Sequence, residues 1–296
     1  MGFTHEPQPV PNSQGEGVAH VVITGGEPLL YGDILQLVRC INDAGIDARL
    51  QSNADAHVTT EKLSALHEAG LRHLTISLDS LRPSIHDDIS RRPGLQAHVI
   101  DTLKNAVDIF RDGMVVSQTV VSNRNIAELP EIASFATKIG AFSSLVPLHR
   151  GRREKEPLRG GDDSFGECPP QLVNSIYDRL MIMKREGYHI AHSDRFLNAS
   201  RRYLLTGDCQ WRCDAGDIYF SILPDGSISL CDDFPPRHNI LDDSFSFAAF
   251  KENARELRQS CPGCIWGCWR EVSYLVNKTG TALDWAKTYL RWRRRP

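Results

Sequence analysis

The segment VAHVVITGGEPLL, residues 18–30, joins a short apolar run to a pair of glycines and an acidic residue. Its first part is rich in β-branched residues and is typical of a buried strand. A helical pattern of apolar residues follows at residues 34–44, and Gly45 ends it just before the next strand-like run. A strand, a glycine turn and a helix in this order predict the first unit of a parallel α/β fold.

The same alternation continues as far as residue 148. Further strands are expected at ARLQSN, HLTISLD, MVVSQTVVS and FSSLVPL, and further helices at residues 60–69, 98–110 and 126–139. Residues that favour helix starts and ends stand at the expected places: Asp33, Thr59 and Asn125 as caps, and Gly45, Gly70, Gly113 and Gly140 as terminators. Five strand–helix alternations predict a parallel sheet within an α/β fold.

The chain divides by composition into four expected parts. Residues 1–17 are rich in Pro, Gly and Gln and are expected to be flexible, and residues 18–150 carry the α/β pattern. Residues 151–205 hold a charged linker loop and a helix at about residues 171–186, with Leu172, Ile176, Leu180 and Met183 on one face. Residues 206–296 form a cysteine-rich domain with a C-terminal helix.

Composition limits the classes of function. With 296 residues, 41% of them apolar, the chain is long enough for a large globular domain, and a net charge of -3 gives no basic field for nucleic acid. The basic run at residues 291–295 is expected to be a solvated helix end. No window approaches the roughly 18 apolar residues of a membrane span, and no export pattern opens the chain. We therefore expect a cytoplasmic protein with reduced thiols, whose Asn198 and Asn277 triplets are not glycosylated.

Six of the eight cysteines lie in the last third of the chain. Their close spacing suits a single metal centre, because thiolates two or three residues apart can turn onto one soft metal. The six are Cys209, Cys213, Cys231, Cys261, Cys264 and Cys268. An iron–sulfur or other metal site is the leading interpretation. A structural zinc site is the first alternative, and a disulfide framework is less favoured in a long chain without an export signal.

Polar residues end the expected strands. Gly25 and Gly26 allow close approach of a ligand to the backbone, and Glu27 follows them at the carboxyl edge of the sheet, where such folds bind ligands. Small polar residues also end the later strands: Ser52, Asn53, Ser77, Asp79, Ser122, Asn123 and Asn125. Their recurrence predicts one shared pocket suited to an amino-acid carboxylate and a ribose. The alternative for each is a tight turn, a helix cap or an Asx turn.

Taken in order, these segments resemble the radical S-adenosylmethionine (radical SAM) superfamily, specifically members with a C-terminal SPASM or twitch auxiliary-cluster domain. The matching pieces are ITGGEPLL, ISLDSL, VVSNRNIAELPEIASFA, LVPLHRGR, CDAGDIYFSILPDGSISLC and CPGCIWGC, which together span about residues 18–269. The resemblance implies a partial (β/α) TIM-like barrel that binds S-adenosylmethionine, followed by a small SPASM/twitch-like iron–sulfur domain.

The resemblance also implies roles for individual residues. Gly25, Gly26 and Glu27 would engage the methionine amino group, Pro28 would shape the turn, and Asn53 and Ser77 occupy strand ends used for cofactor contacts; Asp79 would only fix its strand end. One auxiliary [4Fe-4S] cluster would be held by Cys213, Cys231, Cys261 and Cys264. Asp225 and Gly226 would form the hairpin turn between the two short strands of this domain. Cys209 and Cys268 are surplus: they would replace one of the four, help to hold a second incomplete cluster, or stay free thiols.

The sequence departs from the family at one motif. The Cys-x3-Cys-x2-Cys loop of the catalytic cluster should precede GGEP, but the 24 residues before Gly25 contain no cysteine. Neither Cys40, expected to be a buried core thiol, nor Cys168 can substitute for it. The first strand, cluster loop and first helix of the barrel are expected to be missing, so we do not expect this chain alone to cleave S-adenosylmethionine.

Two explanations stay open. Either the chain is a fragment of a complete radical enzyme, or it is a natural, catalytically inactive module that binds a substrate or partner protein and carries a cluster or zinc. An unrelated (β/α) enzyme with a zinc appendage is a third reading. A complete enzyme would abstract a hydrogen atom from a peptide or small-molecule substrate, with a reductant such as flavodoxin or ferredoxin. No catalytic acid or base is identified; His149, Arg150 and Arg152 would either contact an anionic group or lie in a solvated loop.

Overall fold

The computed structural model describes residues 17–55, 57–149, 168–261 and 263–277 together with residue 286. Several expectations lie outside these residues. They are the flexibility of most of the N-terminal segment, the charged linker loop with Arg150 and Arg152, and the basic C-terminal run.

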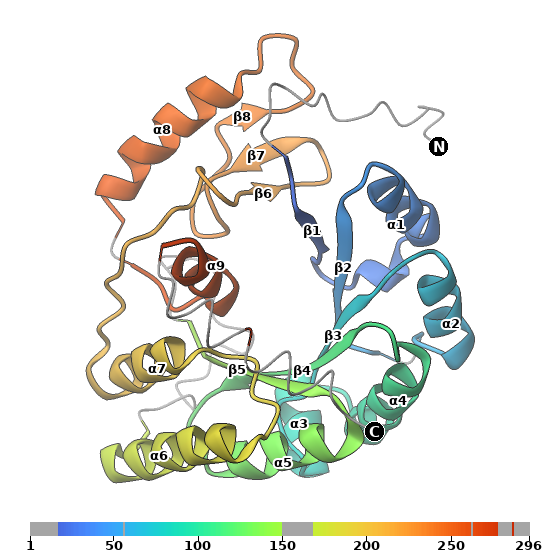
Figure 1. The fold of residues 1–296 in the computed structure, drawn as a ribbon, viewed down its shortest axis with the longest axis vertical. Coiled ribbons are helices and arrows are strands. Elements are labelled where there is room, and N and C mark those ends of the chain that lie inside the picture. The colour runs from blue at the N-terminus through green and yellow to red at the C-terminus, as the bar shows by residue number, and fades with distance from the viewer. Residues whose placement is uncertain (1–16, 56, 150–167, 262, 278–285, 287–296) are drawn as a thin grey trace. The chain divides into compact units, whose positions relative to one another are not determined.

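Five strands form one sheet in the order β1-β2-β3-β4-β5, which is also their order along the chain (Figure 1). Their bounds are His20–Ile23, Asp47–Ser52, His73–Ser77, Met114–Val121 and Phe142–Pro147. The pairs β1/β2, β2/β3 and β3/β4 are parallel. The predicted α/β fold with a parallel sheet is therefore confirmed.

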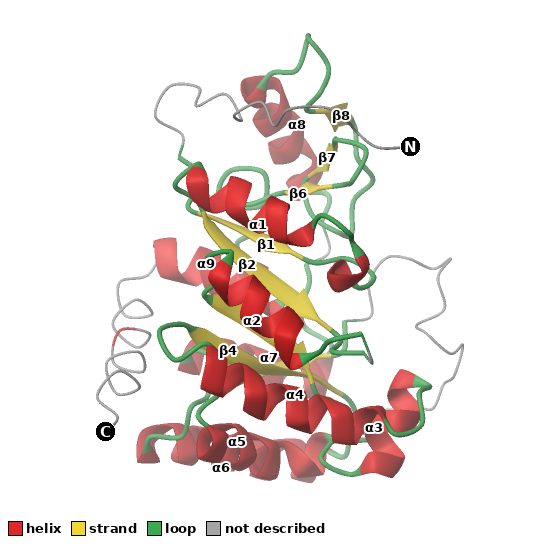
Figure 2. Cartoon of the chain, turned by 90° about the vertical axis from the view of Figure 1, so that its right-hand side faces the viewer, coloured by secondary structure: helices red, strands yellow, loops and turns green. Residues whose placement is uncertain are grey.

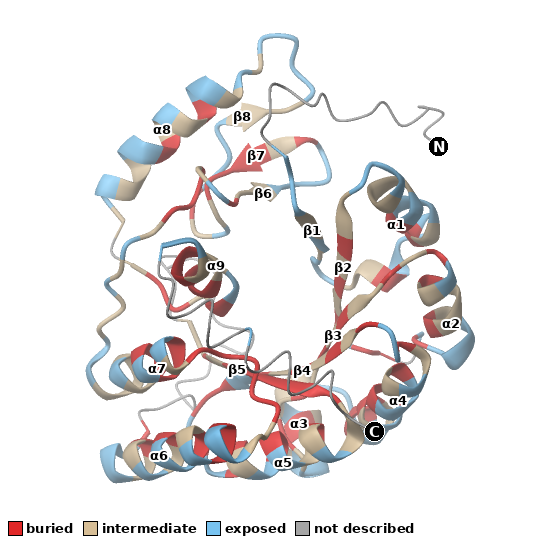
Figure 3. Cartoon of the chain, in the orientation of Figure 1, coloured by how far each residue is buried: buried red, intermediate tan, exposed pale blue. Residues whose placement is uncertain are grey.

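Helices between the strands cover one face of this sheet. Figures 1 and 2 show α1, α2 and α4 on the same side of the strands, and Figure 3 shows buried residues along the surfaces where helices and strands meet. The helical elements here are η1 (Pro28–Leu30), α1 (Ile34–Asp43), α2 (Thr60–Glu68), α3 (Pro83–Ser90), α4 (Leu95–Ile109), η2 (Ile126–Glu128) and α5 (Leu129–Ile139). The core between them includes the fully buried Val38, Leu50, Leu63, Leu74 and Leu103. Cys40, expected in the core, is only partly buried.

Helix ends agree only in part with the sequence prediction. Thr59 caps α2, since its hydroxyl accepts a hydrogen bond from the Lys62 N–H at 3.3 Å. Asp33 stands at the cap position of α1 without a side-chain bond. Asn125 directly precedes the 3-10 helix η2 and not α5, which begins after Glu128. Gly140 ends α5 with a positive φ of 102°, as a terminating glycine should.

The chain separates into two compact units. One contains the described residues up to Thr119 together with Glu128–Leu145 and Tyr188–Ala191, and the other contains Val120–Ala127, the described part of Val146–Gly187, and the described residues from His192 onward. The boundaries predicted at residues 150 and 205 stay a prediction.

The second unit combines helices with a small antiparallel sheet. Its elements are α6 (Pro170–Glu186), α7 (Asp194–Thr206), β6 (Ser221–Ile222), β7 (Ser227–Ser229), β8 (His238–Asn239), α8 (Phe247–Gln259) and α9 (Gly267–Asn277). The expected hairpin turn is present, with Gly226 at φ 82° between β6 and β7. On α6, Leu180 and Met183 are buried as expected, but Val173 and Tyr177 take the buried places assigned to Leu172 and Ile176. Among the described residues, no helix has both the length and the apolar character needed to cross a membrane.

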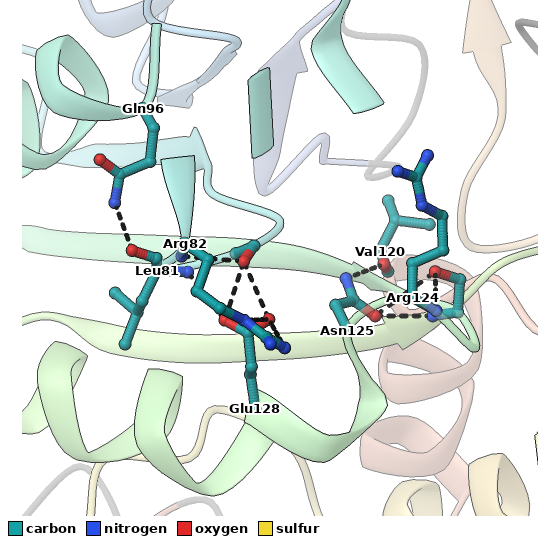
Figure 4. Close-up of polar contacts among 9 residues, drawn as sticks. Leu81, Arg82, Gln96, Val120, Arg124, Asn125 and Glu128 are labelled. Carbon is teal, nitrogen blue, oxygen red and sulfur yellow. Dashed lines mark hydrogen bonds and ion pairs between the residues drawn. The ribbon is translucent and has the colours of Figure 1, made fainter. Parts of the chain in front are cut away.

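A buried carboxylate fixes the loop after β3 within the first unit. The Glu128 side chain, only 5% exposed, accepts hydrogen bonds from the Ser80 hydroxyl, the Leu81 N–H and the Arg82 guanidinium (Figure 4). Ser80 in turn accepts from the Arg82 N–H at 3.0 Å, and the Gln96 amide donates to the Leu81 carbonyl at 2.8 Å. The loop between β3 and α3 is therefore wrapped around one carboxylate of η2.

A second buried carboxylate fixes the loop after β2. Asp55 is 4% exposed, and it accepts from the Arg92 guanidinium at 2.9 Å and from the His57 N–H at 3.1 Å. Burial raises the pKa of the Asp55 carboxyl, but the hydrogen bonds from Arg92 and His57 outweigh this and hold the pKa below its ordinary value.

We predict that Arg82→Met lowers the free energy of unfolding by about 1–3 kcal/mol, because it leaves the buried Glu128 charge with fewer donors. The expected loss is smaller than for a fully buried ion pair, because the Arg82 side chain is 58% exposed and solvent screens its charge. Urea unfolding of both proteins measures the difference. Arg111→Met, at a position 82% exposed, is the control and should change little. Equal losses in the two variants would contradict a role for the buried ion pair.

The Asp55 contacts predict a dependence of stability on pH. Because the carboxyl pKa is lower in the folded chain than its unfolded value of about 3.9, the stabilisation is complete above that value and is lost as pH falls through the folded pKa. Asp55→Asn should therefore be less stable than the wild type near neutral pH, with a smaller loss of unfolding free energy between about pH 5 and pH 3. Asp101→Asn, which removes an exposed ion pair, is the control and should show the wild-type dependence of unfolding free energy on pH.

Candidate functional site

The GGEP turn is tied to the end of the neighbouring strand by one carboxylate. Glu27 Oε1 accepts from the Ser52 hydroxyl at 2.9 Å and from the Leu29 N–H at 3.1 Å. Glu27 Oε2 accepts from the Asn53 N–H at 2.8 Å. The carboxylate thus caps η1 and holds the carboxyl ends of β1 and β2 together.

Asn53 adds a second link between the same two strand ends. Its side-chain amide donates to the Gly26 carbonyl at 3.0 Å. Ser52 pairs in register with Ile76, so Ser77 lies one residue further along the adjacent strand β3. The structure therefore joins three predicted cofactor residues, Gly26, Glu27 and Asn53, by hydrogen bonds, and it places Ser77 at the end of the next strand.

The two glycines leave the backbone of this turn open. Gly25 has a φ of 140°, a region that favours glycine, whereas Gly26 has no such requirement. A Cβ built at either position would have no atom of the chain within 4 Å, and both residues are exposed. Pro28 opens η1 at its first position, as the rigid start of a short helix. A ligand can therefore approach the Gly25 and Gly26 peptides directly.

The polar residues after β4 bind one another in the second unit. The buried Asn125 side chain accepts from the Ser122 N–H at 2.8 Å and donates to the Val120 carbonyl at 2.9 Å (Figure 4). The Arg124 N–H donates to the Ser122 hydroxyl at 3.3 Å. The Ser122–Arg124 contact is an ST turn, the serine counterpart of an Asx turn, and the Asn125 amide bonds back to the end of β4; both are local structural roles of the kind that the sequence left open.

The sheet face opposite the helices carries polar residues that the sequence analysis did not single out. Asp47 binds the Arg49 guanidinium at 2.7 Å and the His73 ring at 3.2 Å. Burial and the nearby Arg49 charge lower the pKa of both His20 and His73, which favours neutral imidazoles at pH 7. The alternation of β2, where Ala48, Leu50 and Ser52 are buried and the residues between them are not, is the signal that identifies this face.

Within the second unit, the cysteines lie around a small apolar core. Cys213, Cys231 and Cys261 pack against a buried cluster that contains Tyr219 and Leu230. Cys264 is buried, and Cys268 is exposed. The electrostatic neighbours of Cys231 include Cys213 and Cys264, and those of Cys213 include Cys261. Cys209 interacts with Cys261 and Cys268 with Cys264, so all six cysteines belong to one electrostatic neighbourhood.

One kind of local contact is shared by Cys213, Cys231, Cys261 and Cys264: a backbone N–H two residues further along the chain points at the sulfur. The Gly263 N–H donates to the Cys261 sulfur at 3.4 Å, and the corresponding backbone N–H groups lower the pKa values of the other three thiols. The four donors, each two residues after its cysteine, belong to Ala215, Asp233, Gly263 and Trp266. Backbone N–H groups aimed at sulfur stabilise a thiolate, the form that binds metals.

The thiols are not preassembled as ligands. Burial raises the pKa of Cys231 and of Cys264 to about 12, so both are neutral thiols unless a metal displaces their protons. The described residues contain no group of three His, Cys, Asp or Glu side chains already arranged to hold an ion. The donor set fits a soft metal or an iron–sulfur cluster in its chemistry, and side chains would have to turn for ligation.

A buried contact of His149 joins the two cysteine segments. His149 Nε2 lies 3.0 Å from Asp233 Oδ2, and the Trp266 indole N–H donates to the same oxygen at 3.1 Å. Asp233 follows Cys231 by two residues, and Trp266 follows Cys264 by two. His149, expected to contact an anion or to lie in a solvated loop, therefore contacts an acidic side chain beside the thiols.

Several known proteins are similar to this chain in sequence. Residues 12–136 match the model of the radical SAM superfamily. The probable GTP 3',8-cyclase of Methanocaldococcus jannaschii is 34% identical over 149 residues, covering 49% of this chain and 46% of that protein. The GTP 3',8-cyclase of Listeria welshimeri is 30% identical, covering 65% and 62%. The chain spans about half the length of the curated relatives it matches.

A solved structure shares the fold. Streptococcus suis SuiB bound to precursor peptide SuiA superposes with a TM-score of 0.56 at 17% identity, covering 88% of this chain and 62% of SuiB. At this identity the likeness concerns the fold alone. Strands β1 to β4 of the parallel sheet and the glycine-rich turn bound to the end of β2 lie within residues 12–136, the part of the chain that matches the radical SAM superfamily model.

Proposed function

We propose that this chain is the S-adenosylmethionine-binding and auxiliary-cluster part of a radical SAM enzyme. The observation that carries the first half is the Glu27 carboxylate, which holds the open Gly25–Gly26 backbone beside Asn53. In the proposal the backbone of this turn receives the methionine amino group. Asn53 and Ser77, on adjacent strand ends, contact the rest of the cofactor.

The second half of the proposal is an auxiliary [4Fe-4S] cluster in a SPASM/twitch-like domain, which follows a partial (β/α) barrel. Its ligands are Cys213, Cys231, Cys261 and Cys264, and the backbone N–H two residues after each sulfur supports this choice. Cys209 and Cys268 are outside the proposed set because the family resemblance assigns the cluster to the other four cysteines. When bound, such a cluster supplies electron transfer or an open iron for a substrate atom.

The proposed reaction class is hydrogen-atom abstraction from a peptide or small-molecule substrate, with flavodoxin or ferredoxin as reductant. Two curated relatives are named for GTP 3',8-cyclisation, which favours a nucleotide among small molecules. The alternative is a catalytically inactive module that holds a cluster or zinc. The division of the chain supports this alternative: the thiols and the strand-end residues belong to different compact units, so metal binding does not require S-adenosylmethionine.

Substitution of Gly26 separates cofactor binding from folding. Since a Cβ at Gly26 meets no atom of the chain, Gly26→Ala should leave thermal unfolding unchanged while it obstructs the backbone approach. We expect its affinity for S-adenosylmethionine, measured by equilibrium dialysis, to fall about tenfold or more. Gly32→Ala, also in open space, is the matched control and should bind like the wild type. Equal affinity of all three, or no binding by the wild type, would contradict the proposed site.

Metal analysis after anaerobic reconstitution tests the proposed auxiliary cluster. We expect about four irons and four sulfides per chain. A combined Cys231→Ala and Cys264→Ala variant should lose this cluster, whereas Cys268→Ala should keep it. One zinc without sulfide would favour the structural-zinc alternative. A parallel assay for 5'-deoxyadenosine under strong reductant tests whether this chain cleaves S-adenosylmethionine.

A further inference from the structure

Arg270 on α9 has an environment unusual for a charged side chain. It has no exposed surface and is the largest fully buried residue among those described. One guanidinium nitrogen, Nη2, donates to the Cys209 carbonyl at 2.6 Å. Within the described residues, Nε and Nη1 are buried without a hydrogen-bond partner.

No carboxylate of the described residues pairs with this guanidinium. Its electrostatic neighbours are Tyr274, Cys264, Cys209 and Arg202, and the last of these repels it. The Trp211 ring lies with its centroid 5.3 Å from the guanidinium carbon, so one side of the group faces an aromatic surface. A buried charge without a paired anion is strongly unfavourable, and folded proteins retain one only where something compensates it.

The nearest groups able to supply that anion are the cysteines. Arg270 acts electrostatically on both Cys209 and Cys264. While these are neutral thiols, the guanidinium gains little from them. Four thiolates around an oxidised [4Fe-4S] core outweigh the charge of the core, so the bound centre is a net anion, and one-electron reduction adds a further negative charge.

We propose that Arg270 is the buried counter-cation of the thiolate-bound centre, and that it both favours binding of the centre and raises its reduction potential. The inference rests on the proposed auxiliary centre and goes beyond it, because it assigns a tuning role to a residue that is not a ligand. Positive charge near the cluster stabilises the reduced form more than the oxidised form. The same charge makes the metal-free chain less stable.

The nearby Arg258 provides a contrast within the same unit. Its guanidinium binds Asp217 at 2.6 Å and also the Ala215 carbonyl, so its charge is already compensated. Removal of Arg258 leaves Asp217 with only its longer ion pair to the exposed Arg255, at 3.7 Å, whereas removal of Arg270 takes no partner from a carboxylate of the described residues. The two arginines are therefore expected to affect the metal-free chain in opposite directions.

The experiment compares the full-length wild type, Arg270→Met, Arg270→Lys and Arg258→Met, each metal-free and each reconstituted with iron and sulfide. For the metal-free chains we expect thermal unfolding of Arg270→Met at or above the wild-type temperature, and of Arg258→Met below it. For the loaded chains, a redox titration followed by electron paramagnetic resonance should give a more negative potential for Arg270→Met. Arg270→Lys keeps the positive charge and should have a potential close to that of the wild type. Arg258→Met should change the potential little.

Retention of the cluster gives a second readout. Arg270→Met should lose iron to a chelator about tenfold faster than the wild type. If both proteins carry the cluster with equal potential and equal retention, or if metal-free Arg270→Met unfolds below the wild type, the role of Arg270 is overturned while the auxiliary cluster stands. If the wild type takes up no cluster or zinc at all, both proposals fall.

Discussion

The geometry of the strand ends depends on one carboxylate. Strand β1 has only four residues, so its backbone pairing with β2 fixes few peptides. Glu27 supplements this pairing with bonds to the Ser52 hydroxyl and the Asn53 N–H. Because Asn53 also binds the Gly26 carbonyl, the turn and the neighbouring strand end form one closed hydrogen-bonded unit. The open glycine backbone is thereby held in place without side-chain packing around it.

Two buried acids of the first unit and one buried arginine of the second differ in how their charges are compensated. In the first, Glu128 and Asp55 each meet an arginine whose side chain is more than half exposed, so the acid is compensated while the cation stays partly solvated. In the second, Arg270 is itself buried and has no such partner among the described residues. The first arrangement stabilises loops of the free chain, and the second is suited to a charge that arrives with a bound group.

The sequence was sufficient for the five strands of the parallel sheet and for α1, α2, α4, α5 and α6, because apolar periodicity and glycine terminators are local signals. The helices α3, α7 and α8 were not predicted. The prediction of helix caps and buried faces failed where several side chains can serve the same local role. Asn125 has the chemistry of a cap, but its amide satisfies the Ser122 N–H and the Val120 carbonyl in the preceding loop. The α6 face was misassigned by one position, since Leu172 and Val173 are equally apolar and tertiary contacts decide which is buried.

The candidate site was predictable in residue type but not in geometry. That Glu27 would bind Asn53 follows from the register of β1 and β2, which no local pattern specifies. The backbone contacts of the four cysteines also depend on loop conformation. Only the polar face around Asp47 could have been found, from the alternation along β2.

The contact of His149 with Asp233 and Trp266 bears on the order of assembly. It joins the segments that follow Cys231 and Cys264 through protein groups alone. Under the proposed function, the polypeptide would therefore reach its folded arrangement first and receive iron and sulfide afterwards, from a donor that acts on a folded acceptor. Maturation of this region would then be limited by the delivery of the inorganic components and by the turning of a few thiols, with the chain already in place.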